Sequence, residues 1–139
     1  FEVEQVVLDI VVTTGIASIL LTAEHIIDYN TGLAHAVFYA LTSYPHIEEN
    51  HLHGEVVGFG ILILLLVDEN EEMFKTMFDF NRSISLPTCL KDIEISESDL
   101  DKLVPMVCAM KDIDHNPYKI TEEMVLKAFK KLEEYNKNN

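Results

Sequence analysis

An uncharged run of twelve residues, VVGFGILILLLV at positions 56–67, constrains the fold of this chain more than any other segment. As a helix the run would rise about 18 Å, against roughly 30 Å of bilayer hydrocarbon, so it is too short to span a membrane. A helix that is apolar on nearly all sides belongs in the middle of a bundle. We therefore predict a central bundle helix that begins near residue 53 and ends near residue 68.

Apolar residues recur at intervals of three and four along much of the remaining chain, which is typical of helices with one buried face. The spacing predicts further helices over residues 3–21, 31–44, 69–80, 96–110 and 124–135. Gly15 is expected to interrupt the first of these helices, and Pro45 to end the second. The fourth is expected to continue despite Pro105.

Local residue types mark where these helices begin and which side chains they bury. Thr31, Ser96 and Thr121 stand where N-caps are expected. Met73, Phe74, Met77 and Phe78 form the expected inward side of the helix 69–80. Residues 22–30, 45–50 and 112–120 are expected to be loops, and 83–96 irregular. The sequence thus predicts an all-α fold, a helical bundle of five to seven helices, in one domain over residues 1–139.

Composition and charge narrow the classes of function. With 48% hydrophobic and 24% charged residues the chain is expected to fold, and its net charge of −14 would repel nucleic acid or an anionic membrane.

Cys89 and Cys108 lack C-x-x-C spacing, so we expect reduced thiols in a cytoplasmic protein. The first residues, FEVEQ, are unlike a signal peptide. Because the chain begins at Phe1, we expect a piece of a longer polypeptide.

Two common kinds of catalytic site are missing from the sequence. The GFG at residues 58–60 lacks the preceding strand and the third glycine of a dinucleotide-binding fingerprint. There is no G-x-S-x-G turn, and neither cysteine has an evident base beside it. A nicotinamide enzyme built on this chain would therefore need another domain.

The histidines are the strongest candidates for chemistry. His35 lies within one predicted helix and His53 at the start of the next, so an antiparallel pair would bring both imidazoles to one end. That arrangement suits zinc or iron, with a third protein ligand and an open position. Six histidines also produce such spacings by chance, and Glu55 fits equally well as an acid favoured near a helix N-terminus. His51, His46 and His25 have no evident partner.

Four segments resemble a known family. They are GLAHAVFYALTS, HLHGEVVGFG, FNRSISLPTCLKDI and DIDHNPYKITEEMVLKAF, and they resemble the C-terminal helical domain of glycerol dehydrogenases, in the iron-dependent alcohol dehydrogenase and dehydroquinate synthase superfamily. The resemblance extends from about residue 3 to residue 135. It implies that His35 and His53 are two ligands of one divalent ion. It also implies that the third ligand, an aspartate, and an N-terminal nucleotide-binding domain that binds NAD lie outside this sequence.

The sequence departs from the family pattern in two places. Tyr39 stands where the dehydroquinate synthase branch carries a histidine used in proton transfer, and the loop at 45–51 is slightly long. The substrate of one relative therefore cannot be assigned to this chain. A small alcohol or polyol is expected, and the negative charge argues mildly against a phosphorylated substrate.

The leading hypothesis is a metal-binding helical domain of an NAD-dependent polyol or glycerol dehydrogenase-like oxidoreductase. By itself the chain is expected to be inactive, because it has neither the cofactor site nor a full ligand set. His51 and Glu55 are the candidates for a third ligand from within the chain. Two alternatives stay open: a non-catalytic stand-alone helical module, and a glycerol-1-phosphate dehydrogenase-like domain. Homo-oligomerisation is also left open.

Overall fold

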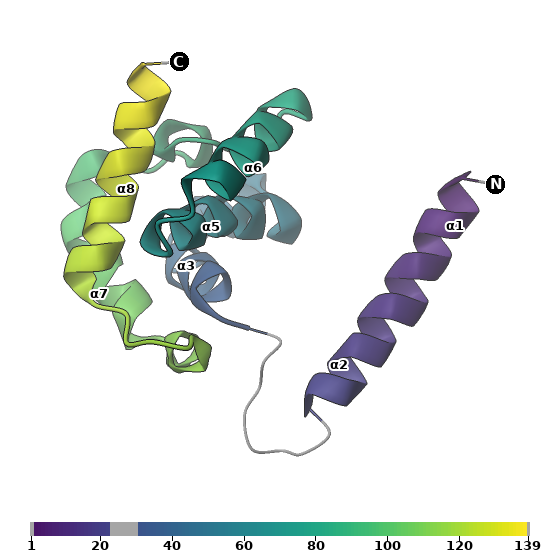
Figure 1. The fold of residues 1–139 in the computed structure, drawn as a ribbon. Helices are drawn as coiled ribbons and strands as arrows, with labels where there is room; N and C mark the ends of the chain where they lie inside the picture. Colours follow the sequence, from purple (N-terminus) through teal and green to yellow (C-terminus); the bar gives the residue numbers. More distant parts are fainter. Residues whose placement is uncertain (1, 23–30, 139) are drawn as a thin grey trace. The chain divides into compact units, whose positions relative to one another are not determined.

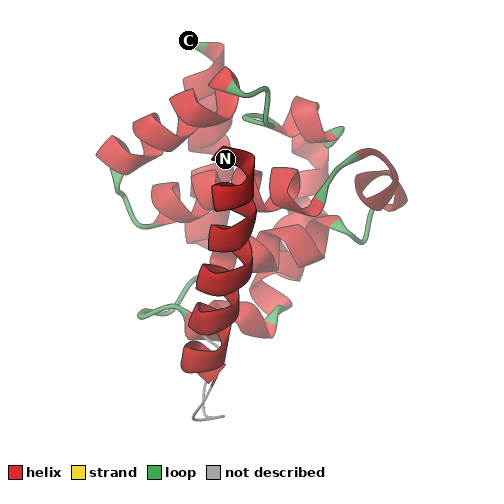
Figure 2. Cartoon of the chain, turned by 90° about the vertical axis from the view of Figure 1, so that its right-hand side faces the viewer, coloured by secondary structure: helices red, strands yellow, loops and turns green. Residues whose placement is uncertain are grey.

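The structure is a computed structural model that describes residues 2–22 and 31–138. The described residues contain helices joined by turns and loops and no strand, as Figure 2 shows. This confirms the predicted all-α fold. The chain falls into two compact units, Phe1–Thr31 and Gly32–Asn139. Each unit is described by itself, and the single domain over residues 1–139 stays a prediction.

The first unit contains one continuous helical segment, as the spacing predicted. It consists of α1 (Glu2–Asp9), a π-helical turn η1 (Ile10–Thr14) and α2 (Gly15–Thr22). Gly15 does not interrupt it, because its φ of −62° and ψ of −46° are helical. The irregularity is the wider π turn just before the glycine. Thr22, predicted to belong to a loop at 22–30, is the last residue of α2, and residues 23–30 lie outside the described part.

The expected buried face of this first helix is not covered by any described residue of its own unit. Its large apolar side chains are exposed because no other described element of the unit packs against them. The exposed side chains are Val3, Val6, Val7, Leu8, Ile10, Val11, Val12, Ile16, Ile19 and Leu20.

The helical segment of the first unit is relevant to the expectation that the protein has no membrane partner. Glu2–Leu20 spans 19 residues and is long and apolar enough to cross a bilayer by length and composition. A buried core helix or a signal sequence has the same properties. The sequence argument against a membrane segment concerned residues 56–67, so it does not extend to this helix. The absence of a membrane partner therefore stays a prediction.

The second unit is a bundle built around one helix, α5 (His53–Val67). In chain order its helices are α3 (Leu33–Leu41), α4 (Pro45–Asn50), α5, α6 (Glu71–Ser83), α7 (Leu100–Ala109) and α8 (Glu122–Lys137). Short 3-10 turns occur at η2 (Leu90–Ile93), η3 (Glu97–Asp99) and η4 (Lys111–His115). With the first unit's helical segment counted as one, the described residues contain seven α-helices, within the predicted range.

The central position predicted for residues 56–67 is confirmed within this unit. Helix α5 contacts α3, α6 and α8, and Figure 1 shows these helices around it. Leu64 and Leu65 are partly buried against the core, whereas the buried apolar side chains of α5 recur at intervals of three and four and share one face of the helix. They are Val56, Phe59, Leu62, Ile63, Leu66 and Val67.

Two helical assignments from the sequence need correction. Residues 45–50, predicted as a loop, form α4, with Pro45 at the first turn. Proline is favourable there because its missing N–H would have no helical partner anyway. Met73, predicted to face inward, is 47% exposed, whereas Phe74 and Phe78 are buried and Met77 is partly buried.

The predicted caps are confirmed in two of three cases. The Thr121 side chain accepts a hydrogen bond from the Met124 backbone N–H, and Ser96 and Asp99 form a reciprocal capping box. Thr31 is not the N-cap of α3, because Gly32 occupies that position. Pro105 lies inside α7 without ending it, as expected.

Candidate metal site

Helices α3 and α5 approach each other very closely, and this contact sets the position of both candidate histidines. A Cβ atom added to Gly60 would collide with the backbone oxygen of Ala34 and lie 3.0 Å from its Cα. Further along α3, Phe38 contacts His53 at the start of α5. Ala34, early in α3, lies against Gly60 in the middle of α5, and Phe38, later in α3, lies against the first residue of α5. The two helices therefore run in opposite directions. The antiparallel pair predicted from the sequence is therefore present.

The two imidazoles lie side by side where α3 contacts the start of α5. The ring centroids of His35 and His53 are 5.8 Å apart, and the ring planes are inclined by 47°. His35 is partly buried in the first turn of α3, and His53 is the exposed first residue of α5. The structure thus brings together the two histidines that the sequence selected.

An aromatic frame surrounds the histidine pair. The Phe38 ring meets the His53 imidazole edge-on, with centroids 4.4 Å apart, and Tyr39 lies 6.2 Å from His35. Phe38 and Tyr39 also contact each other at 5.3 Å. Sequence reasoning missed Phe38, although its position three residues after His35 places it on the same helix face.

The geometry of the pair fits two ligands of a single divalent ion. With nitrogens about 2.0 Å from a tetrahedral ion, two imidazole centroids would be about 5 Å apart. The observed 5.8 Å is within a small side-chain rotation of that value. Within residues 2–22 and 31–138, no group of three or more His, Cys, Asp or Glu residues is arranged to hold a metal. The described residues therefore offer two candidate ligands with no third one grouped beside them.

His51 and Glu55, the candidates for a third ligand, belong to a different cluster. Glu55 Oε2 accepts a hydrogen bond from the Leu52 backbone N–H at 3.1 Å and lies 3.7 Å from His51 Nδ1. The opposite imidazole nitrogen, His51 Nε2, lies 3.6 Å from Glu94 Oε1. Glu55 thus caps the start of α5, which agrees with the simpler of the two sequence interpretations. His25 lies outside the described residues.

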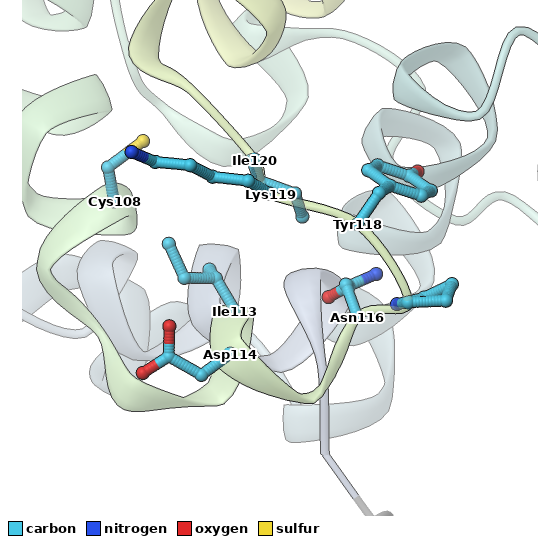
Figure 3. A pocket seen from close by; sticks show the side chains of 8 residues that line it. Cys108, Ile113, Asp114, Asn116, Tyr118, Lys119 and Ile120 are labelled. Carbon is cyan, nitrogen blue, oxygen red and sulfur yellow. The ribbon is translucent and has the colours of Figure 1, made fainter.

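A separate hollow of about 550 Å³ lies beside the N-terminus of α3 and is lined by neither candidate histidine. Figure 3 shows Asn116 at its edge and Cys108 on the opposite side. The Asn116 side-chain oxygen accepts a hydrogen bond from the Leu33 backbone N–H at 3.1 Å. Asn116 therefore caps the helix that carries His35, a role that no local sequence pattern predicts.

Two groups that line the hollow have altered acidities. Burial raises the pKa of the Tyr118 hydroxyl, and the hydrogen bond that this hydroxyl donates to Asp68 raises it further. Burial also raises the pKa of the Cys108 thiol. Cys108 and Cys89 are both free, as expected, but a raised pKa disfavours the thiolate that a nucleophile would need. Burial therefore makes Cys108 a poor candidate for a nucleophile in this hollow.

The fold agrees with comparisons to known proteins. No protein-family model matches the chain. Its homologues are nevertheless dehydrogenases of the iron-containing alcohol dehydrogenase family, and over the matched residues the chain is a dehydrogenase-like helical domain. The family resemblance noted in the sequence is thereby confirmed over 73–78% of the chain.

Individual relatives give the extent of this similarity. The chain is 33% identical to glycerol dehydrogenase from Thermotoga maritima over 107 residues, which is 73% of this chain and 29% of that protein. It is 28% identical to hydroxycarboxylate dehydrogenase A from Escherichia coli over 106 residues, again 73% of this chain and 29% of the relative. The matched length is comparable to that of the unit Gly32–Asn139.

A solved structure shows the same relationship in three dimensions. The chain resembles a probable glycerol dehydrogenase from Sinorhizobium meliloti with a TM-score of 0.70 and 27% identity, over 78% of this chain and 32% of that one. The chain thus spans about a third or less of the length of these relatives. The activity of a whole relative is therefore not assigned to this chain directly.

Proposed function

We propose that this chain is the metal-binding helical domain of an NAD-dependent polyol or glycerol dehydrogenase-like oxidoreductase. The observation that carries the proposal is the proximity of His35 and His53, whose rings lie 5.8 Å apart where α3 contacts the start of α5. The dehydrogenase homologues support the reaction class. The nucleotide-binding part and the third ligand, an aspartate by family resemblance, would come from residues outside this chain.

In this role His35 and His53 hold one zinc or iron ion through a ring nitrogen each. When bound, the ion supplies Lewis-acid stabilisation of the charge that develops on an alcohol oxygen as hydride leaves for NAD. The chain's own contribution is to position the two imidazoles. Phe38 packs against the His53 ring, and the Gly60–Ala34 crossing fixes the separation of the helices.

Transfer of this domain into a relative tests the proposed reaction. In the glycerol dehydrogenase from Thermotoga maritima, the segment matched by this chain would be replaced with residues 32–139. We expect the chimera to oxidise glycerol with NAD, because it would combine this histidine pair with the relative's remaining parts. His53→Ala should abolish turnover and bound metal, whereas His115→Ala, outside the pair, should retain both.

The same chimera separates the alternative functions. A folded chimera that binds metal but turns over neither glycerol nor related polyols would favour the non-catalytic module. Preference for glycerol 1-phosphate over glycerol would favour the phosphorylated-substrate branch. Equal activity in the wild-type and His53→Ala chimeras would contradict the metal assignment.

A further inference from the structure

We propose that Glu94 is a positioning residue that fixes the start of α5 and thereby presents the His53 imidazole to His35. The inference rests on the proposed metal-binding function. Glu94 follows the short turn η2 and is far from His53 in sequence, yet its carboxylate contacts the connection between α4 and α5. It would act through that connection and not by touching the ion.

The contacts of Glu94 fall on the two residues that lead into the first turn of α5. Glu94 Oε1 accepts a hydrogen bond from Asn50 Nδ2 at 2.9 Å, and Asn50 is the last residue of α4. The same oxygen lies 3.6 Å from His51 Nε2. One carboxylate oxygen therefore binds the last residue of α4 and lies beside the first residue of the connection, two positions before the candidate ligand His53.

His51 continues these contacts to a residue within α5. Its side chain is 12% exposed, and its other nitrogen, Nδ1, lies 3.7 Å from Glu55 Oε2. Glu55 in turn accepts the hydrogen bond of the Leu52 backbone N–H at 3.1 Å. The contacts thus continue from Glu94 through His51 to the residues on either side of His53.

The cluster does not form a second metal site. A single ion can bind only one nitrogen of an imidazole, and the two nitrogens of His51 face different carboxylates, Glu55 and Glu94. The described residues contain no three-ligand group of this kind. The arrangement is therefore suited to holding the chain in place.

The backbone of Glu94 indicates that its side chain is the reason for its position. Its φ is 56°, in the left-handed region that glycine adopts at little cost and glutamate does not. A glycine would adopt this backbone conformation at a lower cost in free energy, but it would supply no carboxylate for Asn50 and His51. Glu69 has the same φ of 56° at the opposite end of α5, where its carboxylate forms an ion pair with the exposed Lys127.

Because Glu94 and Glu69 share this left-handed backbone conformation, Glu94→Gly and Glu69→Gly form a matched pair of variants. Both relieve a left-handed backbone and remove an exposed acid, so both should fold at least as stably as the wild type. In the metal-free chain, nuclear Overhauser contacts between the Phe38 and His53 rings should weaken in Glu94→Gly and persist in Glu69→Gly. Glu94→Gln, which keeps an oxygen acceptor for Asn50, should retain them.

Zinc titration followed by imidazole NMR shifts provides the second readout. The dissociation constant should rise about tenfold in Glu94→Gly, as for loss of other groups that orient a ligand, and stay unchanged in Glu69→Gly. Equal ring contacts and equal affinity in the two glycine variants would overturn the positioning role. If the wild type showed no zinc response at His35 and His53, the proposed function would fail, and the metal-free ring contacts would still decide the role of Glu94.

Discussion

The ring of Phe38 stands edge-on against the imidazole of His53, with centroids 4.4 Å apart and planes inclined by 70°. The contact joins α3 to the first residue of α5, and it places an apolar surface beside an otherwise exposed histidine. An edge-to-face aromatic pair contributes about 0.5–1.5 kcal/mol beyond the area that it buries. Phe38 thus limits the freedom of the side chain that we propose as a ligand.

Replacing Phe38 with Leu should release the His53 ring while the bundle remains folded. We expect the His53 ring proton shifts to move toward random-coil values, because the neighbouring aromatic ring is gone. Proton NMR would measure this change. Phe80→Leu is the matched control, since Phe80 is 52% exposed on α6. A His53 spectrum that is identical in Phe38→Leu and the wild type would exclude the contact in solution.

The close crossing of α3 and α5 should make Gly60 intolerant of any side chain. Gly60→Ala places a Cβ against the Ala34 backbone, which cannot move like the end of a flexible side chain. We expect a loss of about 1–3 kcal/mol in the free energy of unfolding, typical of overpacking. Gly54→Ala in the same helix meets nothing within 4 Å and should be neutral or stabilising. Urea denaturation of both variants tests this difference, and equal stabilities would contradict the crossing.

The N-cap of α8 should make a measurable contribution to stability. Thr121→Ala removes the side-chain oxygen that accepts the Met124 N–H, and such losses cost about 1 kcal/mol. Thr76→Ala, at an exposed position within α6, should cost little, because alanine is the better helix former. Thermal unfolding should therefore show a lower midpoint for Thr121→Ala than for Thr76→Ala. The reverse order would argue against the cap.

The start of α7 should give the protein a defined dependence on acid pH. The hydrogen bond from the Ser96 hydroxyl, followed by that from the Ser96 backbone N–H, lowers the pKa of Asp99. Because the folded-state pKa lies below the unfolded value of about 4, Asp99 stabilises the fold above that pH. The contribution is lost as pH falls through the folded-state pKa. Ser96→Ala should raise the pKa of Asp99 in an NMR titration, and an unchanged value would refute this cause.

The sequence predicted the centre of the bundle well because an all-round apolar run has few other places to lie. It also predicted the histidine pair, since a helix, a short connection and an antiparallel helix bring such positions together. Pro45 was interpreted as a helix terminator, whereas it begins α4, and proline is compatible with either role. Periodicity predicted a helix over residues 3–21, observed over 2–22, but not what covers its apolar side chains, because a helical pattern does not specify its partner.

The supporting residues of the candidate site were the least predictable part. Asn116 caps α3 across 83 positions of sequence, and Glu94 reaches Asn50 across 44. Contacts of that separation depend on how the helices pack, and neither residue stands in a local pattern that reveals its partner. Phe38 was the exception, because its spacing from His35 was available in the sequence.

Zinc titration of the 139-residue chain, followed through the imidazole resonances, tests the central claim most directly. We predict that the His35 and His53 signals shift together and saturate at one ion per chain, with weak affinity because two histidines leave the ion underligated. His35→Ala should remove the response of His53 as well. No response at either histidine, or an undiminished His53 response in His35→Ala, would contradict a shared metal site.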